Sequence, residues 1–132
     1  MAVQTAPRGT ETILLVDDDS SVRSVAWIAL EEAGYFVIEE SGAEEALSEV
    51  VARNITVALL VTDVVMPRIS GKELARRLQQ SCPWLRVLYI SGYTADVISH
   101  HGILDADVDY LQKPFHSFEF LTKVREILDR PK

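Results

Sequence analysis

The stretch from Ile13 to Asp19 places four apolar residues directly before three acids. The apolar run is too short for a helix and has no polar alternation, so it favours a strand that is buried on both faces of a sheet. Ser20 follows as a suitable helix N-cap, and a helical pattern begins after it. The acids are therefore expected at the carboxyl end of a central strand, where open α/β sheets bind their ligands.

Clustered carboxylates of this kind are unfavourable unless a cation joins them. Asp17, Asp18 and Asp19 are adjacent in the sequence, and like charges at close range repel one another. We therefore expect a small site for a hard metal ion. The plainer interpretation is a solvated acidic cluster at the amino end of a helix, where negative charge is also favourable.

Apolar runs followed by helical patterns recur along the chain. The expected strands cover residues 12–16, 35–38, 57–62, 86–90 and 109–112. The expected helices cover residues 21–33, 43–51, 71–81, 95–101 and 117–128. Five β-then-α units in this order predict an α/β fold, with a parallel sheet covered by helices on both faces. No second domain can be separated from this pattern.

The spacing of apolar residues predicts which side of each helix faces the sheet. Gly34 is expected to follow the end of the first helix, and Trp27 and Trp84 are most simply interpreted as packing residues. The expected inner residues are Val22, Val25, Ala26, Ala29, Leu30 and Ala33, then Ala43, Ala46, Leu47, Val50 and Val51, then Leu74, Ala75 and Leu78, and finally Phe118, Leu121, Val124 and Leu128.

Composition excludes several classes of protein. A length of 132 residues with 48% hydrophobic residues fits one globular domain. The net charge of −7, without a run of Lys or Arg, argues against a nucleic-acid surface. The N-terminus lacks a signal-peptide core, no stretch is long enough to span a bilayer, and Cys82 is the only cysteine. We therefore expect a cytoplasmic setting without membrane contact.

The first residues differ from the rest of the chain. Residues 1–11 show no periodicity and contain Pro7 and Gly9. We therefore expect a flexible N-terminal tail at 1–11 and one domain at 12–130.

Polar residues follow four of the expected strands. Asp17 and Asp18 follow the first, Asp63 the third, Ser91 the fourth and Lys113 the fifth. Carboxyl ends of parallel strands share one edge, and neighbouring strands lie about 4.8 Å apart, so these side chains can converge. Carboxylates, a hydroxyl and an ammonium are the groups that phosphoryl transfer to an oxygen nucleophile requires. Taken singly, each residue is more simply a turn residue, a helix cap or a surface lysine.

The segments that carry these groups resemble the receiver domain of two-component response regulators. The matching segments are ILLVDDDSSVR, LLVTDVVMPRISGKEL, VLYISGYT and YLQKPF, and the likeness covers nearly the whole chain, from about Thr12 to Leu128. The resemblance implies a flavodoxin-like (βα)5 domain with strand order 2-1-3-4-5. Within the family, ISGYT and LQKPF are most similar to the receiver at the C-terminus of hybrid sensor kinases.

The resemblance implies a metal site and a phosphoacceptor. Asp63, followed by Met66-Pro67 and Gly71, matches the phosphoacceptor aspartate. Asp18, Asp63 and the backbone carbonyl of Val65 would bind Mg²⁺ directly, and Asp17 would act mainly through water.

The remaining matches concern residues that change position when a receiver domain is phosphorylated, which form its conformational switch. Lys113 matches the lysine that pairs with the phosphoryl group, Ser91 the hydroxyl of the switch, and Tyr110 the switch aromatic. Asp19 receives no role from the resemblance. Gly92 stands where the family more often has alanine, a difference that removes no chemical group.

The implied function is signalling. A histidine kinase or a histidine phosphotransfer protein would donate a phosphoryl group from phosphohistidine to Asp63, and the acyl phosphate would switch protein–protein contacts. The domain would not be an enzyme beyond catalysing its own phosphorylation and dephosphorylation. No effector domain follows the last expected helix, so output is expected through protein contact or within a larger chain. The sequence leaves the oligomeric state, the cognate kinase and the signal open.

Two other functions remain open at this stage. The first is a metal-dependent phosphatase with an aspartyl nucleophile, because Asp17 and Asp19 form an Asp-x-Asp after an apolar strand. The chain is short for such an enzyme, and it offers no cap insertion or further acidic pair near its C-terminus. The second is a receiver-like binding module that is never phosphorylated, against which the full residue set argues.

Overall fold

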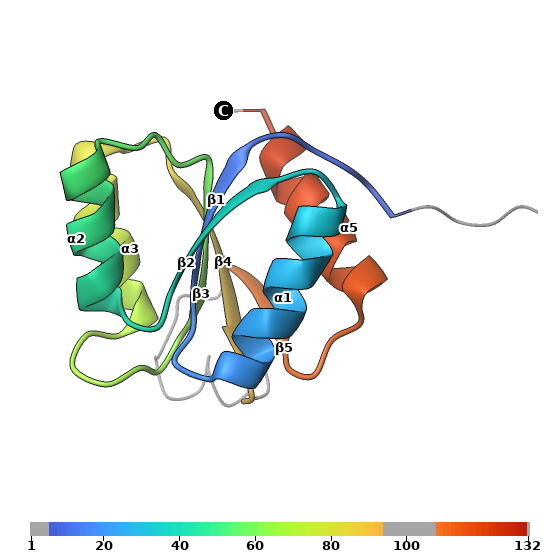
Figure 1. Ribbon diagram of the computed structural model, residues 1–132, viewed down its shortest axis with the longest axis horizontal. Coiled ribbons are helices and arrows are strands. Elements are labelled where there is room, and N and C mark those ends of the chain that lie inside the picture. The colour runs from blue at the N-terminus through green and yellow to red at the C-terminus, as the bar shows by residue number, and fades with distance from the viewer. Residues whose placement is uncertain (1–5, 94–107, 132) are drawn as a thin grey trace, which may run out of the picture.

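A five-stranded parallel sheet forms the centre of the protein (Figure 1). The computed structural model describes residues 6–93 and 108–131. The strands are β1 (Thr12–Val16), β2 (Phe36–Glu40), β3 (Leu59–Asp63), β4 (Arg86–Ser91) and β5 (Asp109–Gln112). Their order is β2-β1-β3-β4-β5, which confirms the flavodoxin-like topology expected from the family resemblance.

Helices cover both faces of the sheet. In Figure 1, α1 (Ser20–Glu32) and α5 (Ser117–Asp129) lie on one side, and α2 (Ala43–Arg53) and α3 (Gly71–Ser81) lie on the other. The short helix expected at 95–101 lies outside the described residues.

The two-sided burial of β1 explains its apolar sequence. Ile13 and Leu15 belong to the core beneath α1 and α5, whereas Leu14 and Val16 belong to the core beneath α2 and α3. All four are 0% exposed, and burying each side chain contributes roughly 1.5–3 kcal/mol. These two cores hold the end of β1, and therefore the acids that follow it, in a fixed position.

The first helix begins one residue earlier than expected, and its cap is Asp19 rather than Ser20. The Asp19 carboxylate accepts hydrogen bonds from the backbone N–H groups of Ser21 (2.9 Å) and Val22 (3.3 Å). Asp and Ser are about equally good N-caps, so residue preference could not distinguish the two positions.

The inner face of α5 was also predicted wrongly in part. Phe118 is 37% exposed, whereas Phe120 and Ile127 are buried at 0% and 1%. Apolar residues occupy enough of α5 to form two alternative stripes with helical spacing. The observed stripe allows the Phe120 ring to stack on Phe115, with ring centroids 5.0 Å apart, and Leu128 is only partly buried.

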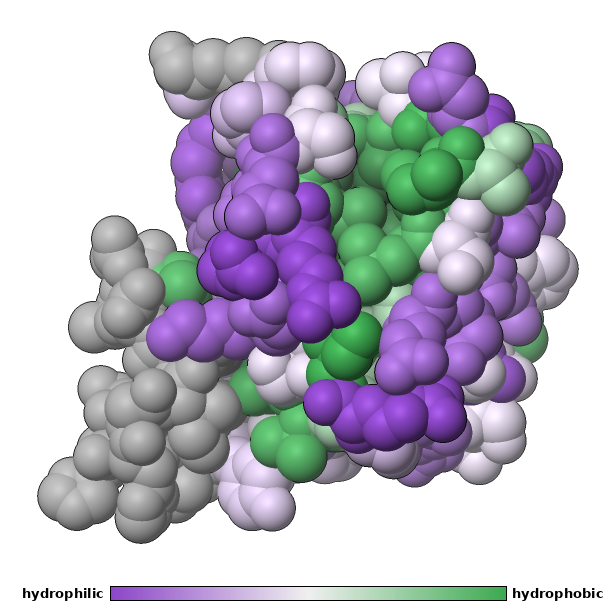
Figure 2. Space-filling view, turned by 90° about the vertical axis from the view of Figure 1, so that its left-hand side faces the viewer, coloured by the Kyte–Doolittle hydropathy of each residue, from purple (hydrophilic) through white to green (hydrophobic). Residues whose placement is uncertain are grey.

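Apolar side chains remain accessible on the face formed by α2 and α3. Figure 2 shows a band of hydrophobic surface between hydrophilic areas on this side of the molecule. Val51 is 79% exposed and Trp84 is 55% exposed, and both line a shallow pocket between the carboxyl ends of the two helices. The prediction that Val51 lies on the inner face of its helix was therefore wrong, as it was for Val25 of α1, which is 51% exposed. Trp84, interpreted as a packing residue, is more than half exposed.

Residues immediately before β1 contact both α1 and α5. The Gly9 N–H donates to the Ala33 carbonyl (3.0 Å), and Arg125 forms an ion pair with Glu11 (2.7 Å). This hydrogen bond from Arg125 lowers the pKa of Glu11 to about 2. The expectation of a flexible tail at 1–11 stays a prediction, and residues 1–5 lie outside the description.

The observed α5 stripe can be tested by two matched substitutions. Phe120→Ala should lower the free energy of unfolding by about 3–5 kcal/mol, because it removes a fully buried ring. Phe118→Ala should cost about 1 kcal/mol or less, because its ring already contacts solvent. Urea unfolding of both variants measures the difference, and equal losses would contradict the described packing.

Candidate functional site

Three acids meet where β1 and β3 end. Asp17, Asp18 and Asp63 each offer a carboxylate oxygen, and these atoms lie within 4.8 Å of one another. Asp17 is buried, Asp63 is half-buried and Asp18 is exposed. The strands are neighbours, with Val16 of β1 paired to Thr62 of β3. Two positions far apart in the sequence thus supply one cluster of carboxylate oxygens that could hold a metal ion.

Lys113 places an ammonium between two of these acids. Its Nζ lies 2.9 Å from Asp17 Oδ2 and 3.2 Å from Asp63 Oδ2. The Lys113 N–H donates to the Ser91 carbonyl (2.8 Å), so the chain leaving β5 stays against the end of β4. The positive charge offsets the repulsion that would otherwise oppose the close approach of the carboxylates.

The pKa values of Asp63 and Lys113 reflect both burial and neighbouring charges. Burial raises the pKa of Asp63, the Lys113 charge opposes this rise, and the Asp17 charge reinforces it. Burial by itself would lower the pKa of Lys113, but the hydrogen bond and charge of Asp17, with a further contribution from Asp63, hold it above the usual lysine value. Lys113 therefore keeps its positive charge at neutral pH.

Asp17 is held from several directions. Its N–H donates to the Glu40 carbonyl (3.3 Å), and its Oδ1 accepts from the Asp19 N–H (2.8 Å). Its Oδ2 is the atom paired with Lys113. A fully buried carboxylate needs such partners, because removing a charge from water is costly.

The loop after β3 fixes Asp63 through backbone contacts. The Val64 N–H donates to the Ile90 carbonyl (3.2 Å), and the Gly71 N–H donates to the Val64 carbonyl (2.9 Å). A Cβ atom at Gly71 would lie 2.0 Å from the Asp63 carbonyl oxygen, so only glycine fits at the start of α3. The Val65 side chain is 53% exposed, and the metal-binding role of its carbonyl stays a prediction.

Ser91 and Tyr110 lie at adjacent strands beside this cluster. Ser91 is 1% exposed, and its hydroxyl accepts a hydrogen bond from the Tyr93 N–H (3.1 Å). Burial raises the pKa of Tyr110, and among the described residues its buried hydroxyl has no hydrogen-bond partner. The roles of Ser91 and Tyr110 in a conformational switch stay predictions.

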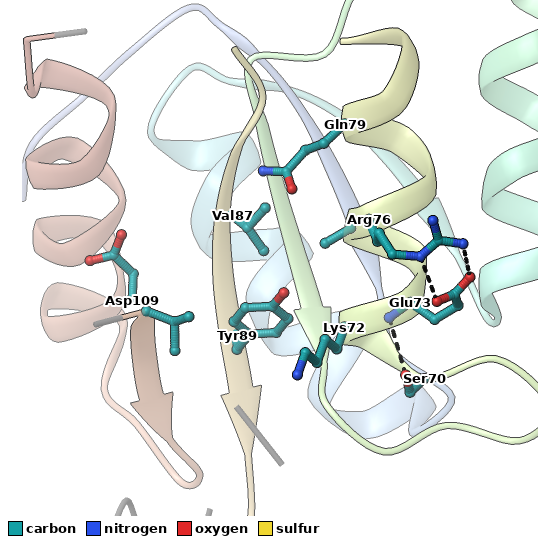
Figure 3. A pocket seen from close by; sticks show the side chains of 10 residues that line it. Ser70, Lys72, Glu73, Arg76, Gln79, Val87, Tyr89 and Asp109 are labelled. Atoms are coloured by element: carbon teal, nitrogen blue, oxygen red, sulfur yellow. Dashed lines mark hydrogen bonds and ion pairs between the residues drawn. The ribbon is translucent and has the colours of Figure 1, made fainter. Parts of the chain in front are cut away.

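A separate hollow lies between α3 and strands β4 and β5 (Figure 3). Glu73 at its rim is already paired with Arg76 (2.6 Å), and the Ser70 hydroxyl accepts from the Glu73 N–H (3.1 Å). Residues 94–107, which connect β4 and β5, lie outside the described residues. We therefore assign no ligand to this hollow.

Comparison with known families gives an extended match. The model of the response regulator receiver domain matches residues 13–125. The sensor kinase CckA of Brucella abortus (strain 2308) is 35% identical over 122 residues, which are 92% of this chain and 13% of the kinase. The response regulator receiver protein CpdR of the same organism is 34% identical over 116 residues, which are 88% of this chain and 95% of CpdR.

A solved structure agrees with the sequence matches. The crystal structure of the receiver domain from the hybrid histidine kinase CckA has a TM-score of 0.74 and 33% identity, and the match covers 89% of this chain and 99% of that domain. The chain thus corresponds to nearly all of one solved domain and of CpdR, but to a small part of the sensor kinase.

Adjacent aspartates should respond oppositely to removal of their carboxylates. Asp18→Ala should leave the metal-free free energy of unfolding unchanged or raise it, because it removes one of three clustered charges, and it should weaken Mg²⁺ binding. Asp19→Ala should lower the free energy of unfolding by about 1 kcal/mol, because it removes the α1 cap, and should leave Mg²⁺ binding intact. Urea unfolding and Mg²⁺ titration measure both quantities.

The opposite pattern would contradict this assignment. A metal-free loss of about 2 kcal/mol or more in Asp18→Ala would make Asp18 a structural residue. Retained Mg²⁺ affinity in the same variant would remove it from the metal site.

Proposed function

The chain belongs to the response regulator receiver family of two-component signalling, and from that premise we propose that Asp63 accepts a phosphoryl group whose presence switches protein–protein contacts. The observation that carries the proposal is the cluster of Asp17, Asp18 and Asp63 with Lys113 between two of its members. The cluster combines an oxygen nucleophile, further oxygen ligands and a fixed positive charge.

The donor set fits a small, hard cation. Carboxylate oxygens are the ligands that Mg²⁺ prefers, and the three oxygens already lie within 4.8 Å of one another. We propose that Asp18, Asp63 and the Val65 carbonyl hold Mg²⁺ directly, and that Asp17 contributes through water. When bound, Mg²⁺ supplies positive charge next to the phosphoryl oxygens.

Asp63 is the proposed nucleophile. One of its carboxylate oxygens forms a bond to phosphorus as the phosphorus–nitrogen bond of the donor phosphohistidine breaks. The electron pair of the broken bond stays on the imidazole nitrogen, which takes up a proton, and Asp63 becomes an acyl phosphate. Attack requires an ionised Asp63, which the Lys113 charge favours against the effect of burial.

Lys113 is the proposed sensor of the new group. Its ammonium now lies 3.2 Å from Asp63 Oδ2, which is within reach of a phosphoryl group attached to this carboxylate. A charge-assisted hydrogen bond to that group would replace its present contact. Ser91 would then turn to hydrogen-bond the phosphoryl oxygens, and Tyr110 would occupy the space that Ser91 leaves, which shifts the population towards a second conformation.

The relatives support a histidine-linked donor. One match is a sensor kinase and another is the receiver domain of a hybrid histidine kinase, so we propose a histidine kinase or a histidine phosphotransfer protein as partner. The likeness to CpdR along most of its length is equally compatible with a separate receiver. Among the described residues, no helix is long and apolar enough to cross a membrane.

Asp63 phosphorylation is directly testable. Incubation with acetyl phosphate and Mg²⁺ should add one phosphoryl group, detected as a shift in intact mass, and Asp63→Asn should abolish it. Asp109→Asn is the matched control, because Asp109 begins β5 at the opposite end of the sheet, and it should be labelled like the parent.

Other outcomes separate the alternatives. Labelling that survives Asp63→Asn and is lost in Asp17→Asn, with turnover of a phosphate ester, would favour the phosphatase. Absence of labelling in a folded protein that binds Mg²⁺ would favour the module that is never phosphorylated.

The lifetime of the acyl phosphate gives a further prediction. In-line attack by water leads past Val65 and Tyr93, which by family resemblance flank the approach, and they are 53% and 52% exposed. Val65 has no group that can orient water, so hydrolysis should be slow. Val65→Asn combined with Tyr93→Glu should speed decay of the phosphorylated protein without changing Mg²⁺ affinity. Equal decay rates at saturating Mg²⁺ would show that neither side chain controls access.

A further inference from the structure

Arg23 connects three elements next to the acidic cluster. It lies in α1, and its side chain is only 18% exposed. Its Nη1 donates a hydrogen bond to the Asp17 carbonyl oxygen (2.5 Å), and its Nε lies 3.7 Å from Glu39 Oε1 of β2. The side chain therefore extends from the helix back to the strand end that carries the acids.

The carbonyl that Arg23 holds belongs to the peptide between Asp17 and Asp18. A peptide unit is planar, so the direction of this carbonyl also sets the direction of the Asp18 N–H and the starting point of the Asp18 side chain. The Asp17 carboxylate is already held by Lys113 and by the Asp19 N–H. Arg23 thus fixes the orientation of the peptide that leads into the exposed Asp18.

The contact with Asp17 matters more than the contact with Glu39. The Glu39 side chain is 44% exposed, and ion pairs at such positions contribute little. In contrast, the bond to the Asp17 carbonyl has a charged donor and is partly buried, and hydrogen bonds with a charged donor are stronger than neutral ones.

We propose that Arg23 is a positioning residue for the Mg²⁺ site: by holding the Asp17 carbonyl, it orients the peptide from which Asp18 reaches the ion. The inference rests on the proposed function, because it concerns the same site. Arg23 itself would touch neither the ion nor the phosphoryl group.

Positioning and simple charge predict opposite effects on metal binding. Removing a nearby positive charge would strengthen binding of a cation, because less repulsion remains. Loss of positioning would weaken binding, because Asp18 is no longer held in place, and loss of an outer partner of a metal ligand typically costs about 10-fold in affinity or more. The sign of the change therefore identifies the mechanism.

The experiment is a Mg²⁺ titration of the unphosphorylated protein followed by amide NMR shifts, together with urea unfolding without metal. Arg23→Met should weaken Mg²⁺ binding about 10-fold, and Arg23→Lys, which retains a donor, should restore much of the affinity. Glu39→Gln removes only the ion pair and should bind like the parent. Arg53→Met controls for loss of a positive charge, because Arg53 ends α2 and pairs with Glu49.

Each outcome decides for or against the inference. Unchanged or tighter binding in Arg23→Met would overturn it, as would equal weakening in Arg53→Met or a loss of stability without a change in affinity. If Arg23→Met does not fold, Arg23→Lys and Arg23→Gln provide the test. If both of these variants bind Mg²⁺ as tightly as the parent and Glu39→Gln binds it more weakly, the ion pair with Glu39, and not the contact with the Asp17 carbonyl, supports metal binding. If the parent protein binds no Mg²⁺, the proposed function fails rather than the role of Arg23.

Discussion

Repulsion among carboxylates is the constraint around which this end of the sheet is built. Asp17 is fully buried next to Asp63, and such an arrangement is unfavourable without a compensating positive charge. The Lys113 ammonium supplies that charge from β5, two strands away from β3 in the sheet order. One ammonium pairs with two carboxylates, so a group that adds or removes charge at Asp63 changes the electrostatic interactions of Asp17, Asp63 and Lys113 together. Such coupling is suited to a signalling site.

Neighbouring residues have distinct roles because they differ in environment. Asp17 continues the buried strand and pairs with Lys113, Asp18 is exposed beside it, and Asp19 caps the following helix. Three identical side chains in sequence therefore serve differently: Asp17 as a buried anchor, Asp18 as a carboxylate open to solvent, and Asp19 as the cap of α1. The glycine at position 71 completes the arrangement by allowing α3 to begin directly against the Asp63 carbonyl.

Much of the fold and of the candidate site could be predicted from the sequence, and each wrong prediction has a physical cause. Strands buried on both faces give continuous apolar runs, so β1 and the acids after it were found directly, and the family resemblance supplied the strand order. The cap was misplaced because Asp19 and Ser20 are equally suitable, and Phe118 was misplaced because α5 offers two apolar stripes. Arg23 escaped notice because a contact between a side chain and a backbone carbonyl leaves no pattern in the sequence.

The role of Asp63 as phosphoacceptor can be tested by a crystal structure of the protein with Mg²⁺ and beryllofluoride, a mimic of the acyl phosphate. If Asp63 is the phosphoacceptor, beryllofluoride should lie on an Asp63 carboxylate oxygen, Mg²⁺ should contact Asp18 and Asp63, and the Lys113 ammonium should turn towards the fluorines. Beryllofluoride bound at Asp17, or an Mg²⁺ ion located away from the three acids, would show that Asp63 is not the phosphoacceptor or that the three acids do not form the metal site.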